Sequence, residues 1–310
     1  RNTRPRSASG SSAAGWAKKG AVQADHVIAG AGCAGLSLAV QLALQARRRG
    51  QPCPRIVLVE PRTQYVRDRT WCYWRFVDHP FAEAVTRRWT RWLVREGARE
   101  VVRGTPAHPY EHVAVDAFYA LARRILAEFP EVELRLGCEV RAIVERADGV
   151  EVETSAGTVT GGAEVDLLQH FVGWEVEAPR AVFDPETPVL MDFAVSQARG
   201  LHFLYVLPFS PTRALVETTY ITEATLPAAA YEADLREYLA ARYGVTEPAV
   251  QFVERGAIPM TTRPAVPRTS ARVVHLGLRG GLAKGSTGYA FQAIQAHTTA
   301  LATELLDRPG

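Results

Sequence analysis

A glycine-rich turn between a strand-like run and a helix-like run constrains the fold of this chain most. Residues 30–35 read Gly-Ala-Gly-Cys-Ala-Gly, after the strand-like run 25–29 and before the helix-like run 36–48. In such a turn the first glycine permits a tight bend, the second lets the backbone approach a pyrophosphate, and the third allows close helix-strand packing. The N-terminus of the helix also offers N–H groups to an anion. The pattern therefore predicts a dinucleotide-phosphate cradle built from Gly30, Gly32, Cys33, Ala34 and Gly35.

The next strand-like run ends on an acidic residue. Residues 55–59 read Arg-Ile-Val-Leu-Val, and Glu60 follows them. A carboxylate at this place accepts hydrogen bonds from an adenosine ribose, and segment 45–54 offers the longer connection that the wide spacing from the glycine turn requires. Strand, helix, strand and acid together predict a βαβ unit and a parallel sheet. The alternative is that the glycines only end a strand.

A second glycine-rich turn lies near the C-terminal end of the sequence. Residues 285–289 read Gly-Ser-Thr-Gly-Tyr, between a strand-like run over 272–277 and a helix-like run over 287–306. One cofactor held by both turns would explain why the two ends of the chain carry the same kind of feature. We therefore expect a discontinuous cofactor domain.

Composition excludes several classes of protein. The chain has 310 residues, of which 47% are hydrophobic, so it can bury a large core. Its formal net charge of +3 gives no global field for nucleic acid. No apolar run approaches the roughly 18 residues of a spanning helix. The cysteines are scattered, without a Cys-x-x-Cys pair or a His/Cys cluster at metal spacing, which predicts a reducing cytoplasm and no structural metal.

The remaining segments suggest one interrupted cofactor domain and one substrate domain. Residues 1–24 read as a disordered tail, since their basic, Ser- and Ala-rich composition lacks the apolar centre of a secretion signal. Residues 67–109 read as irregular and 116–128 as an amphipathic helix. Alternating patterns predict an antiparallel meander over 132–136, 139–145, 150–154 and 158–160, then strands over 189–195, 201–207, 214–221 and 250–256 with a helix over 228–242. We expect a cofactor domain over 25–66, 116–166 and 272–310, and a substrate domain over 67–115 and 167–271.

Several motifs in a fixed order carry a resemblance to a known family. With the first glycine turn, the chain resembles the flavin-dependent lycopene cyclases of bacteria and plants, within the FAD-binding monooxygenase-like superfamily. The resemblance covers about residues 25–306. Its carriers are Arg69-Thr70-Trp71, the runs Leu-Gln-His-Phe-Val-Gly-Trp at 168–174, Tyr-Val-Leu-Pro-Phe-Ser-Pro-Thr-Arg at 205–213 and Leu-Val-Glu-Thr-Thr-Tyr at 215–220, and Gly-Leu-Arg-Gly-Gly at 277–281.

The resemblance implies an α/β fold, with a Rossmann-like FAD-binding domain and a second domain of β-sheet and helix. It implies a redox-neutral reaction that needs reduced FAD, with NAD(P)H as the reductant. A proton adds to the terminal double bond of lycopene, a neighbouring double bond attacks the carbocation, and loss of a proton leaves a β-ring. Cofactor contacts implied by the matching motifs are Arg69, Gly277, Arg279, Gly288 and Tyr289.

The same resemblance places the catalytic acid at Glu217. A carboxyl group that faces an apolar tunnel keeps its proton, because desolvation disfavours the charged form. The alternative is that Glu217 points outward from an amphipathic strand. Trp71 and Tyr205 are candidates for stabilising the cation through their ring faces, although each aromatic residue can equally be core packing.

The chain departs from the family's pattern at two places. Ala283-Lys284-Gly285 stands where most members carry His-Pro, so Lys284 either meets the cofactor or lies in solvent. The connection from 160 to 167 is short for the strand that the family usually has there. These departures keep two alternatives open: a flavin monooxygenase or reductase that acts on another apolar polyene, and an inactive FAD-binding protein.

The substrate implied by the resemblance is a hydrocarbon that must come from a bilayer. The segment 86–95 reads Thr-Arg-Arg-Trp-Thr-Arg-Trp-Leu-Val-Arg, which combines tryptophan with arginine as interfacial segments do. It predicts a cytoplasmic protein that associates peripherally with a membrane surface. The alternative is a solvated basic face over core tryptophans.

Overall fold

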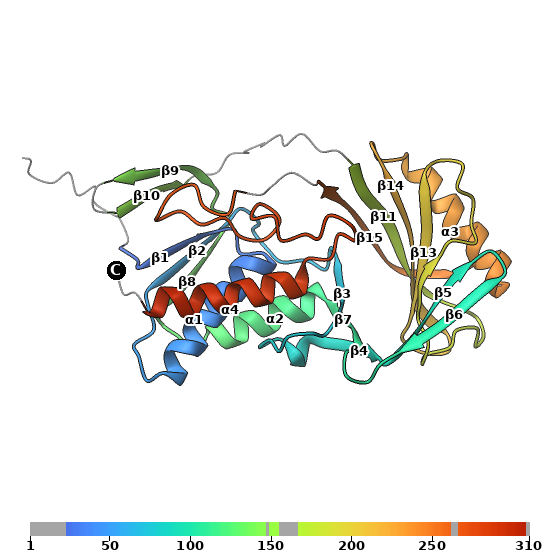
Figure 1. The fold of residues 1–310 in the computed structure, drawn as a ribbon, viewed down its shortest axis with the longest axis horizontal. Helices are drawn as coiled ribbons and strands as arrows, with labels where there is room; N and C mark the ends of the chain where they lie inside the picture. Colours follow the sequence, from blue (N-terminus) through green and yellow to red (C-terminus); the bar gives the residue numbers. More distant parts are fainter. Residues whose placement is uncertain (1–22, 147–148, 155–166, 262–265, 308–310) are drawn as a thin grey trace, which may run out of the picture.

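The computed structural model describes residues 23–146, 149–154, 167–261 and 266–307. Figure 1 shows an elongated α/β molecule with a parallel sheet and most of the helices towards one end and a larger sheet covered by a helix at the other. A small sheet lies between the two. This arrangement has the fold class expected from the sequence.

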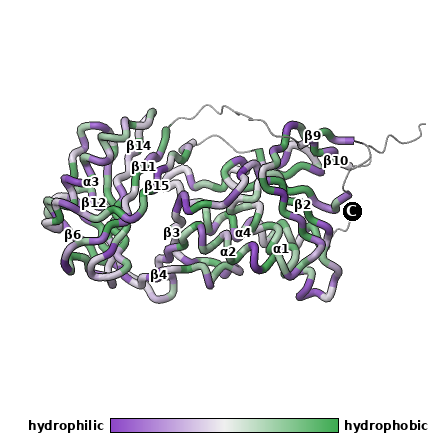
Figure 2. Tube along the Cα trace, turned by 180° about the vertical axis from the view of Figure 1, so that it is seen from behind, coloured by the Kyte–Doolittle hydropathy of each residue, from purple (hydrophilic) through white to green (hydrophobic). Residues whose placement is uncertain are grey.

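The parallel sheet is built on the predicted βαβ unit. Its strand order is β1-β2-β8, and both pairings are parallel. All five residues of β2 are buried, and helices α1, α2 and α4 pack together in the same core. Figure 2 shows hydrophobic stretches along α1 and β2. The elements are β1 (His26–Ala29), α1 (Cys33–Arg48), β2 (Ile56–Glu60), α2 (Val115–Leu126), β8 (Val132–Leu136) and α4 (Phe291–Asp307).

The expected antiparallel meander is wrong in its first strand. β8 pairs in parallel with β2, because α2 returns the chain to the same end of the sheet and Val132 and Leu134 then pack on the helix core. Only β9 (Val140–Arg146) and β10 (Gly149–Thr154) form an antiparallel hairpin. The predicted strand 158–160 and most of the short connection to 167 lie outside the described residues.

The larger sheet has seven strands in the order β15-β11-β14-β13-β12-β5-β6. Its central strands are long and antiparallel, and α3 covers one face through the apolar cluster around Trp174, Val216 and Leu235. Gly244, at φ +63°, ends α3 in the left-handed conformation that glycine tolerates. The elements are β5 (Arg91–Glu96), β6 (Arg99–Gly104), β11 (Leu167–Glu177), β12 (Val189–Asp192), β13 (Leu201–Pro208), β14 (Arg213–Thr222), α3 (Ala228–Tyr243) and β15 (Ala249–Met260).

A three-stranded sheet, β3-β7-β4, separates the helices from the uncovered face of the larger sheet. Side chains of β3 alternate accordingly: Trp71 and Tyr73 contact the helix core, whereas Cys72 and Trp74 pack with residues of the seven-stranded sheet. The middle layer therefore faces the site described below with one set of its side chains. Its elements are β3 (Thr70–Trp74), the short 3₁₀ helix η1 (Ala82–Ala84), β4 (Val85–Trp89) and β7 (Tyr110–Ala114).

Two further expectations differ from the structure. Residues 67–109, expected to be irregular, contain β3 to β6. Residues 272–277 do not form a sheet strand; they fold back on 267–269, with His275 N–H donating to Pro267 O at 2.8 Å and a single bridge between Arg268 and Val274.

The last helix begins at Phe291 rather than at 287. Gly288, at φ +68°, belongs to a turn in which its N–H donates to Lys284 O at 2.8 Å, and this conformation cannot continue into a helix. No helix in the described part of the chain has both the length and the apolar character needed to cross a bilayer.

Candidate functional site

The first glycine turn leaves space in front of the N-terminus of α1. Gly30 has φ +93°, and a Cβ built on it would meet nothing within 4 Å; the nearest atom to a Cβ on Gly32 would be Arg62 Nη2, at 3.9 Å. A Cβ on Gly35 would lie 1.9 Å from Gly30 O, so this glycine is required by packing. Gly30 thus makes the tight bend and Gly35 the close packing that the pattern predicts, and Gly32 leaves open space at the turn.

The groups around this space suit an anion and a hydroxyl-bearing ligand. α1 begins at Cys33 with no side-chain cap on its first N–H groups, which leaves the positive end of the helix for a phosphate. Glu60 is buried, and its carboxylate accepts from Ala31 N–H at 2.8 Å and from Arg62 Nε at 2.7 Å. Desolvation alone would raise the pKa of Glu60, but the hydrogen bonds from Arg62 and Ala31 hold it below its usual value. Glu60 is therefore an ionised acceptor.

The segment before the C-terminal turn reaches this cradle. Gly277 has φ +58°, and a Cβ on it would lie 3.2 Å from Ala34 Cβ at the start of α1. Thr287 Oγ1 is buried and has no hydrogen-bond partner among the described residues. Arg69 pairs with Asp68 at 2.8 Å, while Arg279 and Lys284 are exposed. The open glycine cradle and the uncapped helix fit the phosphates of an FAD, and the unpartnered Thr287 hydroxyl is free to accept a further polar partner.

A second set of polar residues forms one row across the seven-stranded sheet. Glu217 on β14 is paired with Gly173 on β11 and with Tyr205 on β13, and Gly173 is paired on its other side with Glu254 on β15. Residues directly opposite in neighbouring strands point to the same face of a sheet. The two glutamates therefore approach each other over the bare backbone of Gly173.

The surroundings of Glu217 favour its protonated form. Desolvation, followed by the charge of Glu254, raises the pKa of Glu217 well above its usual value, although Thr219 Oγ1 donates to Glu217 Oε1 at 3.0 Å. Glu217 still keeps some accessible surface, whereas Glu254 is 2% exposed. This combination describes an acid that is removed from bulk water yet accessible on one side.

Aromatic rings surround the acid. Tyr289 lies with its hydroxyl 3.4 Å from that of Tyr110, and its ring centroid is 5.7 Å from Trp74. Tyr205 packs in the same cluster, and burial raises the pKa of its phenol, so the ring stays neutral at physiological pH. The apolar cluster on this face comprises Trp89, Tyr110, Leu190, Phe203, Tyr205, Leu207 and Leu215, with Trp74 and Tyr289 against it.

A scan against known families matches residues 25–309 to the model described as lycopene cyclase protein. The chain belongs to the lycopene cyclase family. Among curated relatives, lycopene beta-cyclase of Pantoea ananas is 27% identical over 283 residues, covering 86% of this chain and 70% of the relative. Lycopene beta-cyclase of Pseudescherichia vulneris is 26% identical, covering 92% of this chain and 74% of the relative.

Solved structures share the fold of this lycopene cyclase family member at low sequence identity. A geranylgeranyl bacteriochlorophyll reductase-like protein of Thermoplasma acidophilum has a TM-score of 0.66 at 11% identity, covering 92% of this chain and 79% of the other. PqsL of Pseudomonas aeruginosa, a probable FAD-dependent monooxygenase, has a TM-score of 0.62 at 17% identity, covering 92% and 87%. The expected FAD-binding monooxygenase-like fold is confirmed.

The expected site residues of this family member fall into two groups. Glu217, Tyr205 and Tyr289 come together on the uncovered face of the large sheet. Trp71 lies on the other face of β3, with its ring centroid 5.1 Å from Phe118 and 5.7 Å from Phe291. The structure thus places Trp71 in the helix core and not in the aromatic lining of the acid.

Sequence reasoning missed several residues that complete the two sites. Arg62 fixes Glu60, and Thr70 Oγ1 donates to Glu254 Oε2 at 2.7 Å. Gly173 and Glu254 were also missed, because only strand register brings them beside Glu217. The sequence held one indication of this: Glu254 is a charged residue on the same side of its strand as Phe252 and Gly256.

The interfacial role expected for Trp89 is wrong. Trp89 is 2% exposed, and its Nε1–H donates to Pro185 O at 3.0 Å. Trp92 packs on Trp74 with ring centroids 5.5 Å apart. The segment 86–95 therefore places Trp89 in the core and Trp92 partly buried against it, with arginines that form ion pairs around them, which is the alternative that the sequence left open.

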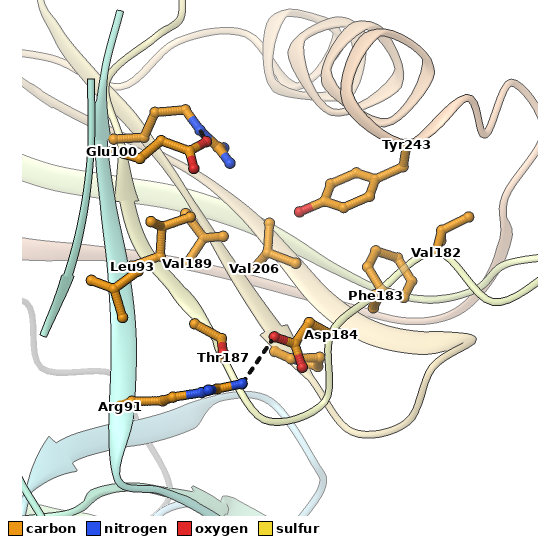
Figure 3. Close-up of a pocket in the computed structure, with 13 residues that line it drawn as sticks. Arg91, Leu93, Glu100, Val182, Phe183, Asp184, Thr187, Val189, Val206 and Tyr243 are labelled. Atoms are coloured by element: carbon orange, nitrogen blue, oxygen red, sulfur yellow. Dashed lines mark hydrogen bonds and ion pairs between the residues drawn. The ribbon is translucent and has the colours of Figure 1, made fainter. Parts of the chain in front are cut away.

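The arginine-bearing side of this segment borders a separate depression of about 350 Å³. Figure 3 shows Arg91 paired with Asp184 at its edge, at 3.4 Å, with Leu93 and Val206 in its wall. Val206 belongs to the face of the sheet that α3 covers. This depression is therefore distinct from the surroundings of Glu217.

Proposed function

We propose that this family member is a carotenoid cyclase that closes the acyclic ends of lycopene to β-rings by proton-initiated, redox-neutral cyclisation. The observation that carries the proposal is a desolvated glutamic acid, Glu217, within an aromatic cluster that faces the three-stranded sheet β3-β7-β4. The curated relatives named lycopene beta-cyclase support the same reaction and a carotene substrate.

The residues of the row formed by Tyr205, Glu217, Gly173 and Glu254, called the acid row below, suit each step of such a reaction. The Glu217 O–H bond breaks as its proton adds to the terminal double bond, and the neighbouring double bond then attacks the tertiary cation to close a six-membered ring. The ring cation then gives a proton back to the carboxylate left by Glu217, so no electron is gained or lost. The faces of Tyr205, Tyr289 and Trp74 would stabilise the cation by about 0.5 to 2 kcal/mol each.

We propose reduced FAD as the cofactor and NAD(P)H as its reductant. The glycine turn 30–35, Glu60, Gly277 and Thr287 would hold the cofactor, within a domain made of segments 25–66, 116–166 and 272–310. Arg69, Arg279, Gly288 and Tyr289 are the further contacts that the family's motifs suggest. When bound, the reduced flavin would supply electron-rich electrostatic stabilisation of the cation.

Peripheral association with a cytoplasmic membrane surface belongs to the same proposal, because lycopene is insoluble in water and must be drawn from lipid. Since Trp89 lies in the core and Trp92 packs against it, segment 86–95 would contribute the charge of its arginines and not aromatic anchoring. Co-sedimentation with anionic and with zwitterionic vesicles tests this point. Equal absence from both pellets would contradict it.

Expression in a lycopene-producing bacterium tests the activity. We expect β-cyclised pigment from the wild type and a loss of about 100-fold or more in Glu217→Gln, which keeps the shape of the side chain but has no acidic proton. Glu223→Gln, an exposed carboxyl group beyond the end of β14, is the matched control and should cyclise normally. Unchanged lycopene in the wild type would overturn the proposed function, as would NADPH consumption that matches product formation, which would indicate a reductase or monooxygenase.

A glycine substitution tests the cofactor site. The chain has space for a Cβ at Gly32, so Gly32→Ala should fold, but the methyl group would occupy the position of the cofactor phosphate. We expect the purified variant to lose flavin absorbance at an unchanged melting temperature. Gly149→Ala, which also has space for its Cβ, is the control and should retain flavin. Flavin retained by Gly32→Ala would argue against this cradle.

A further inference from the structure

We propose that Glu254 is a positioning residue that shares one proton with Glu217, and that Glu217 is the proton donor of the pair. Gly173 has no side chain and so lets the two carboxyl groups approach each other. This inference rests on the proposed function for its role in catalysis. Its structural part, a carboxyl pair with one proton, stands on the geometry of three neighbouring strands.

Strand register brings the pair together. Gly173 lies opposite Glu217 on one side and opposite Glu254 on the other, so all three occupy one row and one face. A Cβ on Gly173 would lie 3.0 Å from Glu254 Cγ and 3.2 Å from Glu254 Oε1. Any side chain at this position would therefore displace the Glu254 carboxyl group. With glycine there, the carboxyl groups of Glu217 and Glu254 come close enough for each to shift the pKa of the other.

A single shared proton gives each of the two buried carboxyl groups a hydrogen-bond partner. If both were ionised, two like charges would face each other away from bulk water, which is costly; if both were neutral, the ionised partner that a carboxylic O–H prefers would be missing. Sharing a single proton makes one O–H···O⁻ hydrogen bond. The proton of such a pair is held to higher pH than that of an isolated carboxyl group.

The hydrogen-bond donors decide which member holds the proton. Thr70 Oγ1 donates to Glu254 at 2.7 Å, and the guanidinium of Arg67 acts on Glu254 from nearby. Among the described residues, the hydroxyl donor to Glu217 is Thr219, through a longer bond of 3.0 Å. Glu254 is thus the better carboxylate and Glu217 the better acid, so the proton lies on the residue that retains accessible surface.

Other titratable groups around the pair do not neutralise it. Arg67, the cation that acts on Glu254, hydrogen-bonds to Glu175 at 2.5 Å. Burial raises the pKa of the Cys72 thiol and of the Tyr205 and Tyr289 phenols, so these groups are neutral at physiological pH. The groups that face the pair are Arg67, Cys72, Glu175, Tyr205 and Tyr289.

The pair also accounts for regeneration of the acid. When Glu217 gives its proton to the alkene, a C–H bond forms, and two carboxylates remain next to each other. Their repulsion makes the pair a strong proton acceptor just as the ring cation must lose a proton. The proton released from the ring returns to the pair, so the reaction balances without an external acid or base.

Glu254→Gln tests the inference, since it keeps the shape and removes the charge. We expect the alkaline limb of the pH–rate profile for cyclisation to move to lower pH by about one unit or more. At a fixed pH above this limb, the rate should then be about tenfold lower than in the wild type. A merely structural role would lower the rate at every pH without moving the limb. Gly173→Ala should move it in the same direction, while Glu247→Gln, an exposed carboxyl group, should leave it unchanged.

A direct titration gives a readout that does not depend on turnover. Infrared spectra of the purified wild type should contain the C=O band of a protonated carboxylic acid at neutral pH, absent in Glu217→Gln and titrating at lower pH in Glu254→Gln. An unshifted alkaline limb or an unshifted band in Glu254→Gln would overturn the shared proton. If that variant does not fold, the same comparison in Gly173→Ala decides. An inactive wild type would refute the proposed function alone, because the infrared titration still tests the pair.

Discussion

Glu175 and the Glu217–Glu254 pair lie on the same face of the seven-stranded sheet, on neighbouring strands, yet their surroundings differ. Glu175 is 1% exposed and accepts hydrogen bonds from Arg67 at 2.5 Å and from Arg213 Nε at 2.6 Å. Desolvation alone would raise its pKa, but the two guanidinium groups hold it below the usual value. The pair has threonine donors and no directly bonded cation among the described residues.

The comparison shows that burial does not by itself decide the role of a carboxyl group. All three glutamates lose hydration in the folded state, which favours their neutral forms. Arginine donors reverse this preference at Glu175 and make it a structural anchor between the layers. Without them, burial keeps a proton on the pair and makes it an acid.

Removing Glu175 should have the largest effect on stability. In Glu175→Gln the hydrogen bonds to charged groups are lost, and we expect the free energy of unfolding to fall by about 1 to 3 kcal/mol. The exposed sides of Arg67 and Arg213 limit the loss, since both guanidinium groups can be rehydrated. Denaturant unfolding at neutral pH measures it. A variant as stable as the wild type would mean that the anchor contributes nothing.

The pH dependence of stability should have opposite signs at the two places. The pKa of Glu217 is higher in the folded than in the unfolded chain, so its contribution to stability falls as the pH rises from the usual glutamate value towards the folded one. We therefore expect Glu217→Gln to gain stability relative to the wild type with increasing pH. Unfolding curves between pH 5 and about 9 test this sign, and parallel pH profiles would contradict it.

For Glu175 the sign is reversed, because its folded pKa is lowered. Its contribution is present above the usual glutamate pKa and is lost as the pH falls through the folded value. Glu175→Gln should therefore converge on the stability of the wild type at acid pH. A gap that stays constant down to the acid range would argue against ionised Glu175 as the anchor.

The two threonines should separate the members of the pair. Thr219→Val removes a donor to Glu217, so the alkaline limb of the rate should move to higher pH by up to about one unit. Thr70→Val removes the donor that holds Glu254 as carboxylate, which moves the proton towards Glu254 and should lower the plateau rate by about 2- to 10-fold. Identical pH profiles for the two variants would show that the donors do not set the asymmetry.

Tyr205→Phe should have the smallest effect. It removes a buried hydroxyl close to Tyr289 but keeps the ring next to Glu217. We expect less than about a 10-fold change in cyclisation rate, since one neutral hydrogen bond contributes about 0.5 to 1.5 kcal/mol. A loss as large as that of Glu217→Gln would show that the phenol, and not the ring, takes part in the reaction.

Local patterns explain what could be predicted. The glycine turn, α1 and Glu60 follow from short-range rules, because a tight turn, a helix and the strand after it are encoded within one stretch of chain. The same holds for α2 and α3, whose bounds agree with the expected helices within a few residues. Strands between 67 and 109 were missed because their pattern includes many arginines that the structure pairs with acids from other segments.

By itself the sequence determined the family, the dinucleotide turn and the position of Glu217, since each depends on residues that are close along the chain. The partner of Glu217, the parallel pairing of β8 and the burial of Trp89 were decided only by the tertiary structure. Strand register is the physical reason: it brings Gly173 and Glu254 beside Glu217 from distant segments, and only then do desolvation and a neighbouring charge raise the pKa of an ordinary glutamate.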